Sequence, residues 1–184
     1  MPAFTPNRNY RYSINSDPAD IPAAIEALDR AVDLDVENLD NSILQRPFAK
    51  ASSHSTTPQA FPSAVVTPML YDFVDHDSDA LVDLVSAPDR MTVTTTGLWF
   101  VWGSVILPNF SYSSKNLHVL KNGVSSERNS MYFDIPGRLI TTSIGAVLHA
   151  VPGDYFQVAL QPNSFTGNVN VTSKQMAVFR LTNT

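Results

Sequence analysis

The chain of 184 residues contains no cysteine. A disulfide framework, a thiolate zinc site and a cysteine nucleophile are therefore excluded. Long apolar runs are also missing, because no stretch approaches the roughly 20 residues of a membrane-spanning helix. The first residues, Met-Pro-Ala-Phe-Thr-Pro-Asn-Arg, lack the charged start and apolar run of a secretion signal. We expect a soluble product made in a cytoplasm, with no membrane insertion.

Positive charge is scarce, and the net charge is −5. Eight of the 17 acidic residues lie between Asp17 and Asp40, where Arg30 is the only basic residue. The rest of the chain, with nine acidic and eleven basic residues, is close to neutral. A protein that binds nucleic acid needs a concentrated basic face, so we predict no nucleic-acid partner.

Residues 17–44 predict a helix that follows an N-terminal arm, residues 1–16, without regular structure of its own. Asp17 or Asp20 can cap this helix, and its acidic start suits the helix dipole. Apolar residues recur at steps of four, three, four, four, three and four, an eleven-residue repeat that gives a nearly straight stripe. This stripe could pack on its own domain, on copies of itself or on a partner, and we favour the last two. The stripe residues are Ile21, Ile25, Leu28, Val32, Val36, Leu39 and Ile43.

A tether and a β domain are predicted after the helix. Residues 45–63 hold Pro47, Pro58 and Pro62 among six Ser and Thr residues, a composition typical of an extended linker. From residue 64 to residue 184, short β-branched and aromatic runs alternate with turn residues. Eight or nine strands without a second helix indicate a mainly β fold, a sandwich or barrel. Lys121-Asn122-Gly123-Val124 predicts a hairpin turn.

One predicted strand is apolar on both faces, namely Leu98-Trp99-Phe100-Val101-Trp102. An outer strand of a monomeric sandwich should alternate apolar and polar residues. One face can fill the core, and the other needs a second cover. We therefore predict that Trp99, Phe100, Val101 and Trp102 serve the core or a subunit interface. The strand at residues 155–161 shows the half-buried pattern instead, with Phe156, Val158 and Leu160 inward.

Five motifs over residues 69–181 resemble the jelly roll shared by the globular heads of complement components and the tumour necrosis factors. The resemblance implies a homotrimer. Residues 16–28 look like the attachment helix of bacteriophage tail and head-fibre proteins, particularly of phages that infect actinobacteria, which implies a virion protein held by capsid or tail proteins. The five motifs are Tyr71-Asp72-Phe73 with Asp77 to Asp79, Gly97-Leu98-Trp99-Phe100-Val101, Lys121-Asn122-Gly123, Gly153-Asp154-Tyr155-Phe156 and Met176-Ala177-Val178-Phe179-Arg180-Leu181.

No pattern in the sequence predicts catalysis. The acidic run from Asp75 to Asp79 resembles the start of a calcium loop, but Ala80 and Ser86 stand where the hand-type site needs Gly and Glu. A simpler calcium site there stays open. The four histidines show no ligand spacing, and there is no nucleophile elbow or Gly-rich phosphate loop. We predict no enzyme activity, no cofactor and no metal.

The leading hypothesis is a homotrimeric structural protein of a bacteriophage virion, assembled in the host cytoplasm as a fibre, minor tail or capsid-decoration subunit. Its jelly-roll head would bind a host-surface glycan through many weak sites at once. Candidate ligand loops carry Phe110, Tyr112, Asn163 and Phe165. One alternative is a scaffold or decoration protein with no host ligand, and another is a glycan-processing enzyme with a β-sandwich head.

Overall fold

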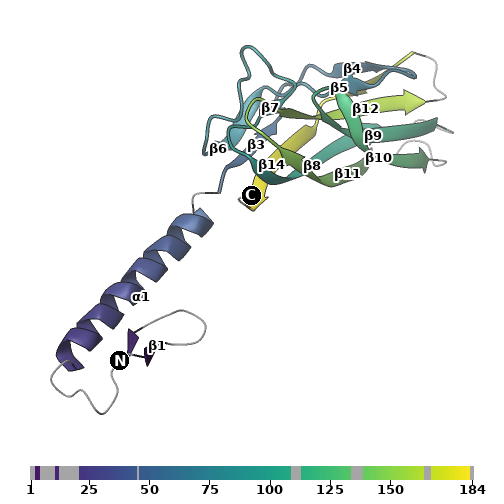
Figure 1. Ribbon diagram of the computed structural model, residues 1–184. Helices are drawn as coiled ribbons and strands as arrows, with labels where there is room; N and C mark the ends of the chain where they lie inside the picture. The colour runs from purple at the N-terminus through teal and green to yellow at the C-terminus, as the bar shows by residue number, and fades with distance from the viewer. Residues whose placement is uncertain are drawn as a thin grey trace. The chain divides into compact units, whose positions relative to one another are not determined.

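The computed structural model describes residues 3–4, 11–12, 21–44, 46–108, 113–133, 139–163 and 167–182, and within the helix it describes the side chains of residues 25–36. The chain divides into two compact units, residues 1–46 and 47–184 (Figure 1). Among the described residues, no helix combines the length and apolar character needed to cross a membrane.

The N-terminal unit contains one helix and two very short strands. The helix α1 (Ile21–Leu44) confirms the predicted helix over these 24 residues, and the expected cap residues 17–20 lie outside the described part. The strands β1 (Ala3–Phe4) and β2 (Arg11–Tyr12) pair antiparallel. The N-terminal arm, which was expected to lack regular structure, therefore contains one short pair of strands.

The predicted linker over residues 45–63 is wrong, because it contains two strands of the second unit. These are β3 (Phe48–Ser52) and β4 (Gln59–Pro62). Ala49 and Ala51 of β3 are fully buried in the core. Pro47 lies just before β3 and Pro62 closes β4, so neither strand needs a proline amide in its interior. The prolines delimit strands here rather than marking an extended tether.

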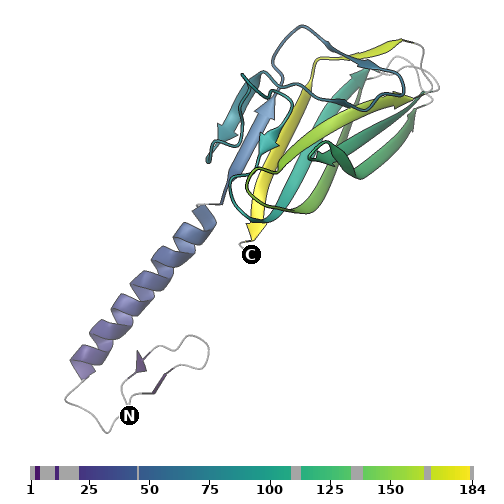
Figure 2. The same cartoon turned by 45° about the horizontal axis from the view of Figure 1, so that its top comes forward.

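The second unit is a sandwich of two antiparallel sheets (Figures 1 and 2). One sheet has the order β11-β8-β14-β3-β6, and the other has the order β10-β9-β12-β5 with β7 also paired to β12. A separate pair joins β13 to β4. The remaining strands are β5 (Thr67–Pro68), β6 (Phe73–Asp77), β7 (Met91–Thr92), β8 (Gly97–Pro108), β9 (Ser113–Lys121), β10 (Val124–Phe133), β11 (Leu139–Ala150), β12 (Tyr155–Asn163), β13 (Asn168–Val171) and β14 (Lys174–Thr182).

The core lies between the two sheets and confirms the inward residues predicted for β12. Phe156, Val158 and Leu160 are fully buried. Gln157 and Ala159, on the opposite face of the same strand, are buried as well. The strand is therefore covered on both faces, whereas its sequence pattern predicted a single buried face.

The predicted hairpin turn between β9 and β10 is confirmed, since Asn122 and Gly123 have φ values of 52° and 78°. Asp154 fastens this turn to the start of β12. Its carboxylate accepts hydrogen bonds from Asn122 Nδ2 at 2.7 Å and Val151 N at 3.0 Å, and pairs with Lys121 Nζ at 2.9 Å. The bonds from Asn122, Lys121 and Val151 lower the pKa of Asp154 to about 2.

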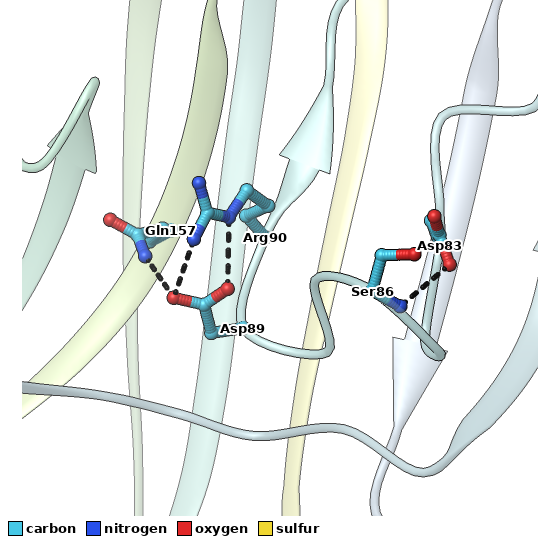
Figure 3. A network of polar contacts seen from close by, with 5 residues as sticks. All are labelled: Asp83, Ser86, Asp89, Arg90 and Gln157. Atoms are coloured by element: carbon cyan, nitrogen blue, oxygen red, sulfur yellow. Dashed lines mark hydrogen bonds and ion pairs between the residues drawn. The ribbon is translucent and has the colours of Figure 1, made fainter.

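A second polar network holds the segment before β7 against β12 (Figure 3). Asp89 accepts hydrogen bonds from Arg90 Nε at 2.9 Å and Gln157 Nε2 at 2.5 Å. The Arg90 guanidinium lies 4.5 Å from the ring centre of Tyr155, a cation–π contact. Nearby, Asp83 accepts the backbone N–H groups of Val85 and Ser86 and closes a turn.

Candidate functional site

The outer side of the five-stranded sheet carries an apolar surface that faces away from the core. Side chains of a strand alternate between its faces. In β8, Trp99 and Val101 are fully buried in the core, so Phe100 and Trp102 point outward. The same alternation in β3, β11 and β14 brings further residues to this side. We call this surface the aromatic face and define it by Phe48, Lys50, Phe100, Trp102, Val147, Ala177 and Phe179.

The strand register arranges the aromatic face in rows across the sheet. In one row Val147 is paired with Phe100, Phe100 with Phe179, and Phe179 with Phe48. The next row runs from Gly145 through Trp102 and Ala177 to Lys50. The row after that is polar throughout and consists of Ser143, Ser104, Gln175 and Ser52. The apolar surface is thus bordered by small polar residues on one side.

Ring contacts within the sheet cover the aromatic face only in part. Phe100 and Phe179 are tilted by 45° with ring centres 5.1 Å apart. A Cβ atom at Gly145 would lie 2.9 Å from Phe100 Cζ, so this glycine leaves room for the Phe100 ring. Phe100, Trp102 and Phe179 are half-buried, and Val147 is 54% exposed. A single protomer therefore leaves apolar area in contact with water.

The β3–β6 edge of the aromatic face is charged. His76 stacks on Phe48 with ring centres 5.1 Å apart, and Lys50 Nζ lies 3.9 Å from Asp75 Oδ2. The opposite edge, at β11, presents Val147. The two edges of the face thus differ in chemistry.

The four residues predicted to serve the core or an interface divide between these roles. Trp99 and Val101 belong to the core, and Phe100 and Trp102 to the aromatic face. The register that joins them to β3, β11 and β14 could not be read from their own strand.

The apolar stripe of α1 is largely exposed over the part whose side chains are described. Ile25, Val32 and Val36 are exposed, and Leu28 is half-buried. The side chains of Ile21, Leu39 and Ile43 lie outside the described part.

The structure describes one of the four candidate ligand residues, Asn163. Phe110, Tyr112 and Phe165 lie outside the described part of the chain. Asn163, at the end of β12, is half-buried opposite Ser114 of β9. The glycan site stays a prediction.

The acidic run at the end of β6 has a structural role. Asp77 Oδ1 accepts the N–H of Leu81 at 2.9 Å, and its Oδ2 accepts that of Val82 at 3.0 Å. Asp79 accepts the hydroxyl of Ser78 at 2.7 Å. Among the described residues, no group of three or more His, Asp or Glu side chains could hold a metal ion.

One cavity was not anticipated from the sequence. It measures about 270 Å³ and is bounded by residues of the β3–β4 loop, the β5–β6 segment and Lys174. Lys174 is buried, its Nζ donates to Ser53 Oγ at 3.2 Å, and burial lowers its pKa. Burial by itself would raise the pKa of Asp72, but backbone hydrogen bonds from His54 and Ser55 hold it below its usual value. A single lysine at the start of a strand does not indicate in the sequence that a pocket lies beside it.

Comparison with known proteins identifies the fold. No protein-family model matches the chain, and no curated protein sequence matches it. Solved structures do match. The globular domain of zebrafish complement 1qA protein aligns with 76% of this chain and 99% of its own, at 15% identity and a TM-score of 0.54. The Eiger TNF of S. frugiperda aligns with 76% and 96%, at 13% identity and a TM-score of 0.53. Murine APRIL aligns with 74% and 99%, at 12% identity and a TM-score of 0.52.

The predicted fold class is therefore confirmed. The second unit is a jelly-roll sandwich of the complement and tumour-necrosis-factor type, preceded by an N-terminal helix. At identities of 12–15% the likeness shows the fold alone.

Proposed function

We propose that this chain is a non-enzymatic structural and binding subunit that assembles as a homotrimer through the aromatic face. The observation that carries the proposal is the partly exposed row of Phe100, Phe179 and Phe48 with Trp102 beside it. Fully burying a large apolar side chain contributes roughly 1.5–3 kcal/mol. Because these rings are already about two-thirds covered or more, covering the rest contributes at most roughly 1 kcal/mol each, and a trimer gains this three times.

The two edges of the aromatic face differ in chemistry, and this difference favours a closed ring of three subunits. A two-fold dimer pairs identical patches, whereas a three-fold ring joins two different patches of each subunit. Here an apolar edge at β11 is available to meet the β3–β6 edge, where Lys50, His76 and Asp75 lie. The jelly-roll resemblance also implies three copies.

Sedimentation equilibrium of the full chain tests the assembly. We expect a mass three times the protomer's 20.2 kDa. Trp102→Glu would bury an unpaired carboxylate in each contact, which costs several kcal/mol, so this variant should lose the trimeric head contact. Val124→Glu is the matched control, because Val124 is 70% exposed on the other sheet, and it should stay trimeric. A monomeric wild type at micromolar concentration would contradict the proposal.

We further propose that the subunit belongs to a bacteriophage virion, where the N-terminal unit attaches it to the capsid or tail and the head binds a host-surface glycan. The resemblance of residues 16–28 to phage attachment helices and the division into two units support this reading. Three weak sites per trimer would multiply affinity through effective concentration.

Competition for host cells tests the glycan proposal. Cells incubated first with purified wild-type protein should adsorb fewer particles. Monomer prepared from Trp102→Glu should compete far less, because a single site lacks avidity. Unchanged adsorption with the wild type would favour a decoration protein without a host ligand. Release of reducing sugars from the cell-wall polysaccharide would instead favour the glycan-processing alternative.

A further inference from the structure

Three residues of the apolar stripe on α1 are exposed in the part of the helix whose side chains the structure describes. Ile25, Val32 and Val36 are exposed to 55%, 41% and 53%. In water most helical stability comes from burying an apolar face, since helix propensity contributes little beyond balancing the cost of nucleation. A 24-residue helix with this exposure therefore needs a covering surface.

The spacing of the stripe fits a bundle of copies. Steps of four, three and four residues occur twice between Ile21 and Ile43, which gives three apolar positions per eleven residues. An eleven-residue period of about 3.67 residues per turn lies close to the 3.6 of a straight helix. The seam therefore stays on one side of the helix over its whole length of about 36 Å. Such a narrow and unbroken seam suits helices that lie side by side with little supercoiling.

The chain between the helix and the first strand of the second unit is short. Leu44 ends α1 and Phe48 begins β3, so three residues separate them and span at most about 14 Å between the two Cα atoms. The strand β3 belongs to the sheet that carries the aromatic face. In a three-fold head, the three helix ends would be held by equal short tethers, which gives each helix an effective concentration near the millimolar range.

We propose that three copies of α1 pack in parallel along the stripe and form a helical bundle that continues the head trimer. The proposal rests on the proposed homotrimer for its three-fold symmetry. It adds a second self-association surface, with its own sequence repeat, outside the jelly roll.

The charge of α1 gives this bundle a distinctive response to salt. The helix carries six carboxylates and one guanidinium, a net charge of −5, and Arg30 is already paired with Glu26 in the same helix. Helices of equal negative charge repel one another, and salt screens this repulsion over a Debye length of about 8 Å at physiological ionic strength. Self-association should therefore strengthen as salt is added. Docking onto a basic partner would weaken instead.

The test uses the full chain with the head interface removed by Trp102→Glu. In this background the protein is studied at about 1 mM, which matches the effective concentration that the head would supply. We expect monomers at about 0.02 M salt and trimers at about 0.5 M, with the association constant rising at least tenfold. Val32→Asn added to the same chain should abolish this association. Leu34→Asn is the matched control, because Leu34 lies off the stripe and is 58% exposed, and it should leave association intact. Sedimentation equilibrium gives the mass, and tryptophan fluorescence verifies that the head is folded.

The outcomes separate the bundle from the head trimer. If Trp102→Glu stays monomeric at every salt concentration while the wild type is trimeric, the bundle is refuted and the head trimer stands. If Val32→Asn and Leu34→Asn weaken association equally, the stripe is not the contact and the bundle is likewise refuted. Association that weakens with salt also overturns it. A wild type that is monomeric throughout overturns both proposals.

Discussion

Gly103 is the position where the structure makes the sharpest stability prediction. This residue lies in the middle of β8, paired with Ile144 of β11 on one side and Met176 of β14 on the other. A Cβ atom placed on it would lie 2.5 Å and 2.6 Å from the two Cγ atoms of Val158 across the sandwich. Carbon atoms in good contact are roughly 3.5–4.0 Å apart, so Gly103→Ala forces the two sheets to shift.

The expected cost of Gly103→Ala follows from this overlap. Both strands are paired on two sides and Val158 is fully buried, so neither can move freely. Overpacking of this kind destabilises a domain by about 1–3 kcal/mol, which lowers the melting temperature by about 3–10 °C. Val158→Ala by itself removes two methyl groups and leaves a small cavity, at a cost of about 2–3 kcal/mol.

The double variant provides the decisive comparison. Val158→Ala removes the atoms that the new methyl group would strike, so the double variant should be about 1–3 kcal/mol more stable than the sum of the two single changes predicts. Urea unfolding followed by tryptophan fluorescence measures this at one fixed protein concentration, because oligomers gain stability with concentration. Val93→Ala, another buried valine, should combine additively with Gly103→Ala. An unchanged urea midpoint for Gly103→Ala, or equal coupling with Val93→Ala, would refute the steric reasoning.

Two further predictions concern polar groups. Because the pKa of Asp154 is lowered to about 2 in the folded state, its contribution is fully present above about pH 4, the pKa of an unfolded Asp, and is lost as the pH falls towards 2. Asp154→Asn should lower the free energy of unfolding by about 1–3 kcal/mol at neutral pH, and that free energy should then depend less on pH between pH 4 and 2. If urea unfolding shows the same pH dependence in this range for the variant and the wild type, the prediction is wrong. The buried hydroxyl of Tyr71 has no hydrogen-bond partner among the residues that the structure describes, and burial, followed by the charge of Asp89, raises its pKa. Tyr71→Phe should therefore leave the unfolding free energy unchanged or raise it by up to about 1 kcal/mol, whereas a clear loss would point to a missing partner.

Local patterns predicted much of the secondary structure. The turn at Asn122-Gly123 follows from the tolerance of both residues for positive φ. The helix follows from the spacing of its apolar residues, and the inward residues of β12 follow from strict alternation. In each case the signal lies within one continuous segment of the chain, so no knowledge of distant residues is needed to recognise it.

The strand β3 shows where local patterns are insufficient. Phe48-Ala49-Lys50-Ala51-Ser52 has little apolar bulk, and it follows a proline. It becomes a buried strand because β14, more than 120 residues further along the chain, supplies its hydrogen-bond partners. Small side chains at Ala49 and Ala51 fit a core whose volume is provided by other strands. The amino-acid composition of this segment therefore does not predict that it forms a buried strand.

The sequence by itself determined that β8 has apolar side chains on both faces and that α1 has an apolar stripe along one side, because alternation and helical period are properties of single segments. Only the tertiary structure decided that Phe48, Phe100 and Phe179 form one row, since strand register depends on pairing between residues far apart in the chain. For the same reason the close approach of Gly103 to Val158 emerged only when two sheets packed face to face.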